Sequence, residues 1–317
     1  SVIEGRVLEF QTAVPIASYD DYTRFNYIAS VGENMSRVWN GAVTKQIPFI
    51  PQSPTLEDLK RLPEYKSLAE GSRYIPIAYE YDSAMLYSID LQKVYCYSIT
   101  GKASTGKTNV LKIIMAAAAQ KNAQCFVIET GSEQLKVFTQ KCGFKYIDSC
   151  KEIINLFNSI TPEFVARNKK KHSLQSKGMS EQDIFDEMSK SQAIYFFVSD
   201  FYDFINIIYH PADSVGNISG FFENILEKGY LHNIFFVSCI DTDKTAAMLA
   251  YKAYKLFTGY KTGIHMGGNL ASQQIFSFSN VPFQQSSKPM AKGEGLVADD
   301  NDSNMSKKLI VPLLGGI

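Results

Sequence analysis

Residues 101–108, Gly-Lys-Ala-Ser-Thr-Gly-Lys-Thr, form the motif that most constrains this chain. They match the G-x-x-x-x-G-K-[ST] pattern of a phosphate-binding loop in full. An apolar segment at 94–99 precedes the motif, and a segment with helical patterning follows it. In such a loop, glycines let backbone amides turn toward a phosphate, and the amino end of the next helix adds partial positive charge. The motif therefore predicts a strand, a phosphate-binding loop and a helix, in that order.

The same loop predicts that the chain binds ATP with Mg²⁺. We expect the Lys107 ammonium to reach the β- and γ-phosphates, and the Thr108 hydroxyl to ligate Mg²⁺. The expected nucleotide-binding residues are Gly101, Lys102, Ala103, Ser104, Thr105, Gly106, Lys107, Thr108 and Asn109. Two alternatives stay open: a glycine-rich turn that has no ligand, and a loop that keeps the fold but has lost tight affinity for nucleotide.

ATP hydrolysis at a P-loop also needs an acid at the end of a neighbouring apolar strand, where it helps to hold Mg²⁺. The best candidate strand is 193–198, which is followed by Ser199 and Asp200, with Asp203 three residues later. We expect Asp200 to be the catalytic acid and a Mg²⁺ ligand, although its side chain is short and Ser199 occupies the position directly after the strand. As an alternative, Asp200 caps the helix that follows it.

A second acid, Glu129, follows the apolar strand 125–128 and lies at the carboxyl edge, where open α/β sheets bind their ligands. Helix capping is the alternative for this residue too. No arginine follows the strand 193–198, so an arginine finger is hard to supply from this chain. Together with Ser199, this predicts an ATPase site that is weak or inactive.

From Thr100 onward, apolar segments alternate with helical ones. The expected strands are 124–129, 193–198, 234–239 and 263–266, with a short one at Ile147, and the expected helices are 107–121, 132–141, 150–160 with a polar continuation to about 190, 217–228 and 243–257. Strands that are apolar throughout and separated by helices predict a parallel sheet covered on both faces. The predicted fold class is therefore α/β, a RecA-like P-loop NTPase core with a mainly parallel central sheet flanked by helices.

The amino-terminal part adds a strand and helices to this core. We expect a strand at 6–14, an amphipathic helix at 19–39, a linker containing Pro48, Pro51 and Pro54, and a short helix at 56–62 capped by Thr55. Residues rich in Tyr, Ile and Val predict further strands at 74–79, 84–89 and 94–100.

Charge and cysteine usage restrict the class of partner and the compartment. Lys+Arg and Asp+Glu both total 32, so the formal net charge is +0, which argues against a basic nucleic-acid binder. The basic run 167–172 is interpreted as a solvated helix face, with a binding patch as the alternative. The longest apolar run is too short to span a bilayer, no signal peptide is evident, and the five cysteines have no metal-site spacing. We therefore expect reduced thiols and a cytoplasmic location.

Several motifs resemble a known family. The P-loop followed by Asn109, the segment 128–135 (Ile-Glu-Thr-Gly-Ser-Glu-Gln-Leu) and the strand ending at 199–201 (Ser-Asp-Phe) resemble an FtsK/SpoIIIE-type ATPase domain. Segments 5–15, 47–51 and 262–270 are similar to the junctions between successive ATPase modules of EssC/EccC (YukB-like) proteins, the membrane-anchored motors of bacterial type VII secretion. In this family the positions of Ser199 and Asp200 carry Asp and Glu, so the resemblance also implies a degenerate site.

The resemblance implies how the chain is organised. Residues 293–298 and 307–312 weakly repeat the opening segment, which implies a C-terminal (third) module. Residues 1–55 would be a junction from the preceding module, and 56–317 the ATPase domain. The implied location is the cytoplasmic domain of a membrane-anchored protein, and the implied partners are the preceding ATPase modules, a hexamer in the full assembly, and secreted helical WXG-type and LXG-type proteins.

Three functions follow from these observations. The first is an ATPase-like module that binds ATP weakly or hydrolyses little and contributes to recognition and export of secreted proteins, with the aromatic stretch 201–209 either lining a groove for an export-signal helix or packing in the core. The alternative is an active FtsK-like DNA translocase, against which the charge balance weighs. The third is an interaction module with an empty P-loop.

Overall fold

The computed structural model describes residues 2–3, 6–7, 16–17, 20–41, 48–211, 218–298 and 305–315. These divide into two compact units, Ser1–Ile47 and Pro48–Ile317. The sequence places the domain boundary at 55/56, whereas residues 48–55 belong to the second unit. The reason is local: the Leu313 amide donates to the Pro54 carbonyl, and the Leu56 amide donates to the Leu313 carbonyl, each over 2.8 Å.

In the first unit, β1 (Val2–Ile3) pairs antiparallel with β2 (Arg6–Val7), and α1 spans Asp21–Val38. The expected helix is confirmed, and Asp20 caps it by accepting the amides of Tyr22 and Thr23. The remainder of the expected strand 6–14 lies outside the described residues. Every residue of α1 is at least partly exposed, including Phe25 and Met35 on its apolar side.

The second unit is built on a ten-stranded sheet with the order β4-β3-β12-β11-β10-β5-β9-β8-β6-β7. The strands are β3 (Tyr74–Glu80), β4 (Leu86–Asp90), β5 (Cys96–Gly101), β6 (Ala123–Ile128), β7 (Lys145–Ile147), β8 (Ala193–Val198), β9 (Ile234–Asp241), β10 (Gly263–Asn269), β11 (Pro289–Ala298) and β12 (Ser306–Ile310). Strands β10, β5, β9, β8, β6 and β7 run parallel, which confirms the mainly parallel core. β11, β12, β3 and β4 extend it antiparallel, and the sequence predicted no strand at β11 or β12.

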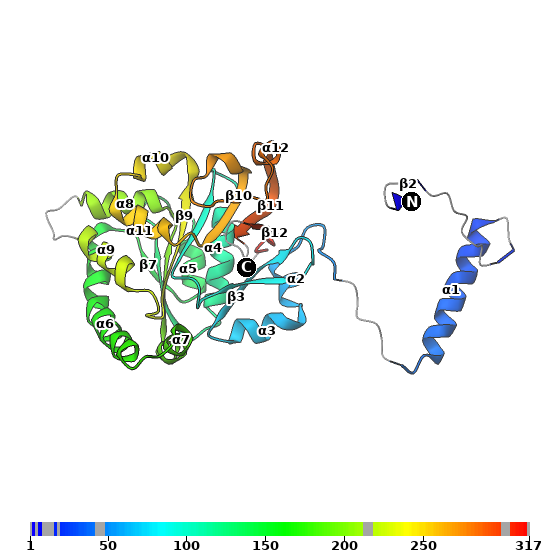
Figure 1. The fold of residues 1–317 in the computed structure, drawn as a ribbon, viewed down its shortest axis with the longest axis horizontal. Helices are drawn as coiled ribbons and strands as arrows, with labels where there is room; N and C mark the ends of the chain where they lie inside the picture. Colours follow the sequence, from blue (N-terminus) through cyan, green and yellow to red (C-terminus); the bar gives the residue numbers. More distant parts are fainter. Residues whose placement is uncertain are drawn as a thin grey trace. The chain divides into compact units, whose positions relative to one another are not determined.

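Helices cover both faces of this sheet (Figure 1). They are α2 (Leu56–Lys60), α3 (Pro63–Glu70), α4 (Lys107–Ala118), α5 (Lys136–Lys141), α6 (Cys150–Ser176), α7 (Glu181–Ser189), α8 (Phe201–Tyr209), α9 (Ile218–Lys228), α10 (Thr245–Met248), α11 (Lys252–Gly259) and α12 (Phe283–Ser286), with 3₁₀ turns η1 (Thr242–Lys244) and η2 (Leu270–Ser272). The helix expected at 243–257 is therefore wrong as one element, since η1, α10 and α11 divide it. The helix expected at 132–141 begins only at Lys136.

Alternate residues of each central strand enter opposite cores. In β8, Tyr195 and Phe197 pack with α4 and α7, whereas Ile194, Phe196 and Val198 pack with α6, α8 and α9. All five side chains are at most 2% exposed. Because side chains alternate across a strand, a strand buried on both faces must be apolar at every position. This is why β8 reads as a continuous apolar run in the sequence.

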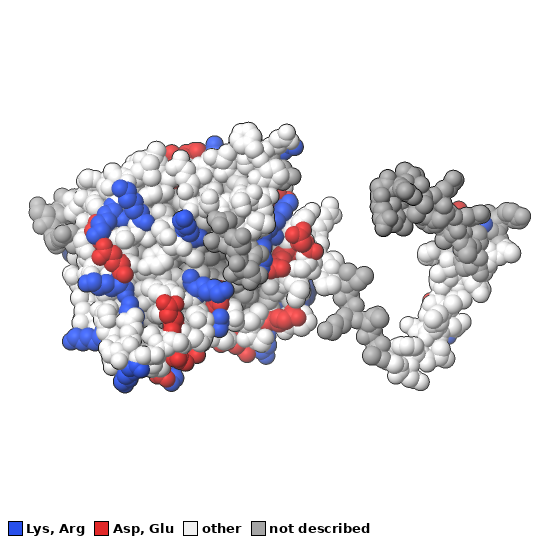
Figure 2. Space-filling model, in the orientation of Figure 1, with Lys and Arg blue, Asp and Glu red and all other residues white. Residues whose placement is uncertain are grey.

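The basic run 167–172 is divided by the turn of α6. Arg167 and Lys171 are buried, whereas Lys169, Lys170 and His172 are exposed. Arg167 donates to the carbonyls of three residues at the amino ends of β8 and β9, over 2.7–3.0 Å. The interpretation of the whole run as a solvated face is therefore wrong for its two buried cations, which serve the core. Lys and Arg are interspersed with Asp and Glu on the face that Figure 2 shows.

Candidate functional site

The backbone of the loop 101–108 has positive φ angles at its two motif glycines, Gly101 and Gly106. β5 ends at Gly101, and α4 begins at Lys107 directly after Gly106, whose φ is 101°. Gly101 has a φ of 153°, and a Cβ there would lie 2.3 Å from the Met266 carbonyl oxygen of β10. Both positions favour glycine, since other residues rarely adopt this half of conformational space. The predicted order of strand, loop and helix is confirmed.

Lys107 folds back across this loop. Its ammonium donates to the Gly101 carbonyl over 2.7 Å and to the Lys102 carbonyl, and it lies 3.6 Å from Asp241 Oδ2 at the end of β9. The side chain is only 12% exposed. Loop carbonyls and a carboxylate thus satisfy the cation, and an arriving phosphate would compete with them for it.

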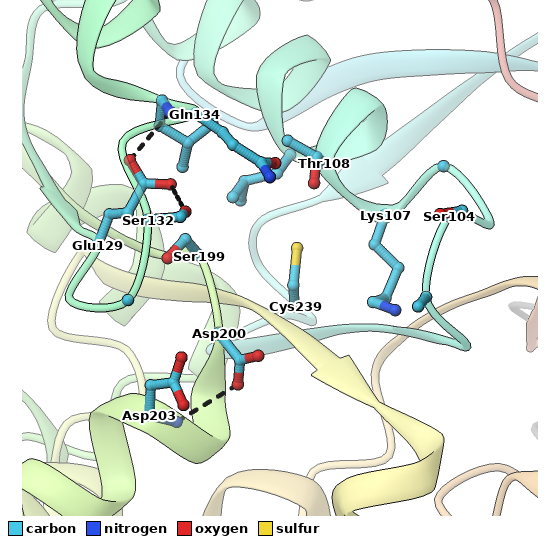
Figure 3. Close-up of a pocket in the computed structure, with 15 residues that line it drawn as sticks. Ser104, Lys107, Thr108, Glu129, Ser132, Gln134, Ser199, Asp200, Asp203 and Cys239 are labelled. Carbon is cyan, nitrogen blue, oxygen red and sulfur yellow. Dashed lines mark hydrogen bonds between the residues drawn. The ribbon is translucent and has the colours of Figure 1, made fainter.

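A cavity of about 530 Å³ opens beside the loop at the carboxyl ends of the parallel strands. Figure 3 shows Lys107 on one side of it, with Asp200 and Asp203 on the other. It is lined by Ala103, Ser104, Gly106, Lys107, Thr108, Leu111, Glu129, Gly131, Ser132, Gln134, Leu135, Ser199, Asp200, Asp203 and Cys239. The P-loop and the acid-bearing strand end therefore share one cavity, although β9 separates β5 from β8 in the sheet.

Not every residue of the expected nucleotide site lines this cavity. Gly101, Lys102, Thr105 and Asn109 are outside the lining. Lys102 lies 3.5 Å from a carboxylate oxygen of Asp243, and the Thr105 hydroxyl donates to the Lys102 carbonyl over 2.9 Å. These three loop residues thus shape the loop through contacts within it and with η1.

The Asn109 carboxamide is directed to the carboxyl-terminal segment. It donates to the Pro312 carbonyl over 2.9 Å and accepts the Leu314 amide over 3.1 Å. These two bonds join the first turn of α4 to residues that follow β12. The sequence indicates Asn109 as a nucleotide ligand, whereas its polar atoms here hold two backbone groups.

Asp200 lines the cavity and caps α8 at the same time. Its Oδ1 accepts the amides of Tyr202 and Asp203, over 2.9 and 3.3 Å. Its Oδ2 accepts the Lys244 ammonium over 2.8 Å. The structure therefore shows the capping contact that the sequence offers as an alternative for Asp200. Ser199, the preceding residue, contributes a neutral side chain to the lining.

Asp203 is the second carboxylate on this side of the cavity. Burial raises the pKa of its carboxyl above the ordinary value, Asp200 raises it further, and Lys244 opposes both effects from 3.8 Å. Asp203 also approaches the backbone of the opposite wall closely, because a Cβ on Gly131 would lie 2.6 Å from its Oδ2. In the sequence, Asp203 has no distinguishing pattern beyond its position three residues after Asp200.

Glu129 organises the loop after β6. Its side chain accepts the Ser132 hydroxyl over 2.6 Å, the Leu135 amide over 2.9 Å and the Tyr146 hydroxyl over 2.9 Å, and the residue is 1% exposed. Burial first, and then the bond to this carboxylate, raise the pKa of Tyr146 well above its ordinary value. With both oxygens engaged, Glu129 has a positioning role and shapes the wall that carries Ser132 and Leu135.

Two residues of the cavity region have no signal in the sequence. Cys239 of β9 lines it, and burial raises the pKa of this thiol to about 12. Lys244 of η1 is 44 positions from Asp200, and only the order of β8 and β9 in the sheet brings them together.

The cavity fits a nucleotide phosphate better than it fits Mg²⁺. The strained loop, the amino end of α4 and the Lys107 ammonium form a cradle for an anion. Mg²⁺ prefers carboxylates and phosphate oxygens. On the acidic side, however, Ser199 is neutral and both oxygens of Asp200 already have donors. The lining thus suits the phosphate groups of a nucleotide, and the groups open to Mg²⁺ are the Thr108 hydroxyl and the Asp203 carboxylate, because Lys244 pairs with Asp200.

A P-loop at the carboxyl edge of a mainly parallel sheet, with the acid-bearing strand two places away, defines the fold of a P-loop ATPase. No family model and no curated protein matches the sequence. Among solved structures, the cytoplasmic domain of EssC is similar with a TM-score of 0.70 and 15% identity, over 98% of this chain and 58% of that chain. The fold is therefore that of an EssC/EccC-type ATPase domain, as the resemblance implies.

Two further structures share this fold. Thermomonospora curvata EccC (ATPases 2 and 3), in complex with a signal sequence peptide, has a TM-score of 0.61 and 15% identity over 93% of this chain and 49% of that chain. The pCW3 conjugation coupling protein TcpA, in its monomer form with ATPγS, has a TM-score of 0.59 and 12% identity over 92% of this chain and 82% of that chain. The chain spans about half the length of the EssC and EccC chains it matches. No helix among the described residues is long and apolar enough to cross a membrane.

Proposed function

We propose that this chain is an ATPase-like module of a type VII secretion motor that binds ATP and hydrolyses it weakly or not at all. One observation supports this most directly. The loop 101–108 and its cavity are intact, whereas the acid that hydrolysis needs is replaced by Ser199, and Asp200 is engaged by the α8 amides and Lys244. Binding and catalysis use different parts of the cavity, so the second can be lost while the first remains.

The test is to measure ATP binding by calorimetry and phosphate release on the same preparation. We expect binding, a turnover near background, and loss of binding in Lys107→Ala. The double variant Ser199→Asp with Asp200→Glu supplies the two acids of the family pattern. Increased turnover would locate the defect at this strand end, whereas unchanged turnover would point to a missing arginine or oligomer. An absence of ATP binding at millimolar nucleotide would refute the proposal.

The second part of the proposal concerns partners within the motor. The similar EccC structure contains ATPases 2 and 3, which supports a preceding ATPase module of the same polypeptide as a partner. The proposal also includes a membrane-anchored protein that assembles as a hexamer, as the family resemblance implies. The apolar side chains of α1, including Phe25, Ile28 and Met35, are exposed in the described part of the chain and suit packing on such a module. Residues 1–47 would then be the junction. A longer polypeptide should bury α1, detectable as slower amide exchange.

The third part concerns the cargo. EccC with a signal sequence peptide supports a role in recognising helical secreted proteins of WXG or LXG type. The stretch 201–209 does not offer the groove, since Phe201, Phe204, Ile205 and Ile208 are at most 1% exposed in the core. Fluorescence anisotropy with labelled export-signal peptides would measure the interaction. A scrambled peptide that binds equally well would argue against specific recognition.

A DNA translocase remains the alternative, and the similarity to TcpA is the observation that favours it. Against it, two cations of the basic run are buried and bonded to backbone carbonyls, so they are not free to contact phosphates of DNA. ATP hydrolysis that is stimulated by DNA and falls steeply with salt would support translocation over protein export.

A further inference from the structure

The turn η1, which follows β9, brings a lysine to the acidic side of the cavity. The Lys244 ammonium lies 2.8 Å from Asp200 Oδ2 and 3.8 Å from Asp203 Oδ1. It also lies 5.0 Å from the centre of the Tyr202 ring. Although partial burial lowers it, Asp200, together with Asp203 and Asp241, holds the pKa of Lys244 above its ordinary value. One cation thus serves both carboxylates of this wall.

The position of Lys244 is fixed from both sides. Its own turn is capped by Asp241, which accepts the Asp243 amide over 3.0 Å and also lies next to Lys107. Its acceptor, Asp200, is fixed by the two α8 amides on its other oxygen. The short, capped turn therefore positions the Lys244 ammonium against Asp200, and both oxygens of that carboxylate then have donors.

The charges of the cavity explain what such a cation would do. Three carboxylates, Glu129, Asp200 and Asp203, line the cavity, against the single lining ammonium of Lys107. A nucleotide triphosphate would add several negative charges beside them. In a P-loop ATPase, Mg²⁺ offsets this repulsion. Here Lys244 already offsets part of the negative charge of the acidic wall, and, because it is tethered there, it competes with a free ion at high effective concentration.

We propose that the Lys244 ammonium takes the place of Mg²⁺ as the counter-charge on the acidic side, so that this chain binds ATP without Mg²⁺. This inference rests on the proposed function, because it concerns how the same cavity accepts a nucleotide. Lys244 is a positioning and specificity residue: it holds Asp200 away from a metal and decides which form of ATP is bound.

Calorimetric titration of the full chain with ATP, once in excess Mg²⁺ and once in excess EDTA, tests the inference. For the unaltered chain we expect the dissociation constants in the two buffers to agree within about threefold, because Lys244 already supplies the counter-charge. Lys244→Met should lose about tenfold in affinity in EDTA and regain it in Mg²⁺. Lys244→Arg, which keeps the charge, should behave as the unaltered chain does.

Lys252→Met is the matched control. Lys252 also pairs with two carboxylates, Glu223 at 3.6 Å and Glu227 at 2.7 Å, but neither of these carboxylates lines the cavity, unlike the two that pair with Lys244. It should leave both dissociation constants unchanged. If the unaltered chain binds ATP only with Mg²⁺, the role of Lys244 is refuted while nucleotide binding stands. If ATP binds in neither buffer, the proposed function itself fails. The comparison of buffers needs no variant, so it decides the matter even where Lys244→Met does not fold.

Discussion

Asn109 has either a structural role or a nucleotide-binding role, and the substitution Asn109→Ala distinguishes them because the two roles predict opposite results. The change removes the bond to the Pro312 carbonyl and the bond from the Leu314 amide. A typical hydrogen bond contributes about 1 kcal/mol net, so the loss should be about 2 kcal/mol in the free energy of unfolding. For a domain of this size that corresponds to a fall of roughly 4–8 °C in the melting temperature. The affinity for ATP should not change, because Asn109 lies outside the cavity lining.

Thermal unfolding followed by circular dichroism, together with calorimetric titration of ATP, measures both quantities on one sample. Asn122→Ala is the matched control, since Asn122 is exposed and its side chain accepts a single long bond from Gln192 at 3.3 Å. It should shift the melting temperature little. The reasoning is refuted if Asn109→Ala keeps the melting temperature of the unaltered chain but weakens ATP binding several-fold.

Three further predictions follow from buried groups. Gly101→Ala should abolish ATP binding and lower the melting temperature, measured by calorimetry and thermal unfolding, because the new Cβ would lie 2.3 Å from the Met266 carbonyl oxygen; full binding would contradict the assigned loop geometry. Arg167→Met should cost about 3 kcal/mol in urea unfolding, because it leaves three backbone carbonyls without their donor; a cost near zero would show that water replaces the guanidinium. Burial lowers the pKa of His232 to about 3, so the unfolded chain binds more protons below pH 6.5 and stability should fall by at most about 1.4 kcal/mol per pH unit on acidification from there toward pH 3. His232→Gln should reduce that dependence, whereas the exposed His210→Gln should not, and equal slopes in both would contradict the assignment.

Elements that depend on local pattern were predicted closely. The apolar run of β8 was predicted at its observed bounds, 193–198, and the capping box of α2 appears as Thr55 indicated. Such elements are encoded by burial periodicity and by side chains a few residues apart, which a sequence displays directly. β11 and β12 were missed because their glycines, lysines and exposed positions give no continuous apolar run, and they are stabilised by pairing with β10 and β3.

The candidate site shows the same difference between features encoded locally and features that depend on long-range packing. Asp200 was found because an acid after an apolar strand is a local signal, and the capping alternative was visible in the same residues. That both of its oxygens are occupied, one of them by Lys244, was not visible, because the partner lies 44 positions away and reaches it only through the neighbouring strand. Glu129 was likewise visible as an edge acid, but its three bonded donors were not.

The sequence by itself determined that this chain has a phosphate-binding loop between a buried strand and a helix, because glycine conformation and helix polarity act within eight residues. It also determined the mainly parallel core, since continuous apolar strands must be covered on both faces. Only the tertiary structure decided which polar groups face one another across the cavity. Strand order is set by long-range packing, and it places β9, with Lys244 after it, between the loop and the acid. Charge neutralisation at the site therefore depends on that order and not on any one motif.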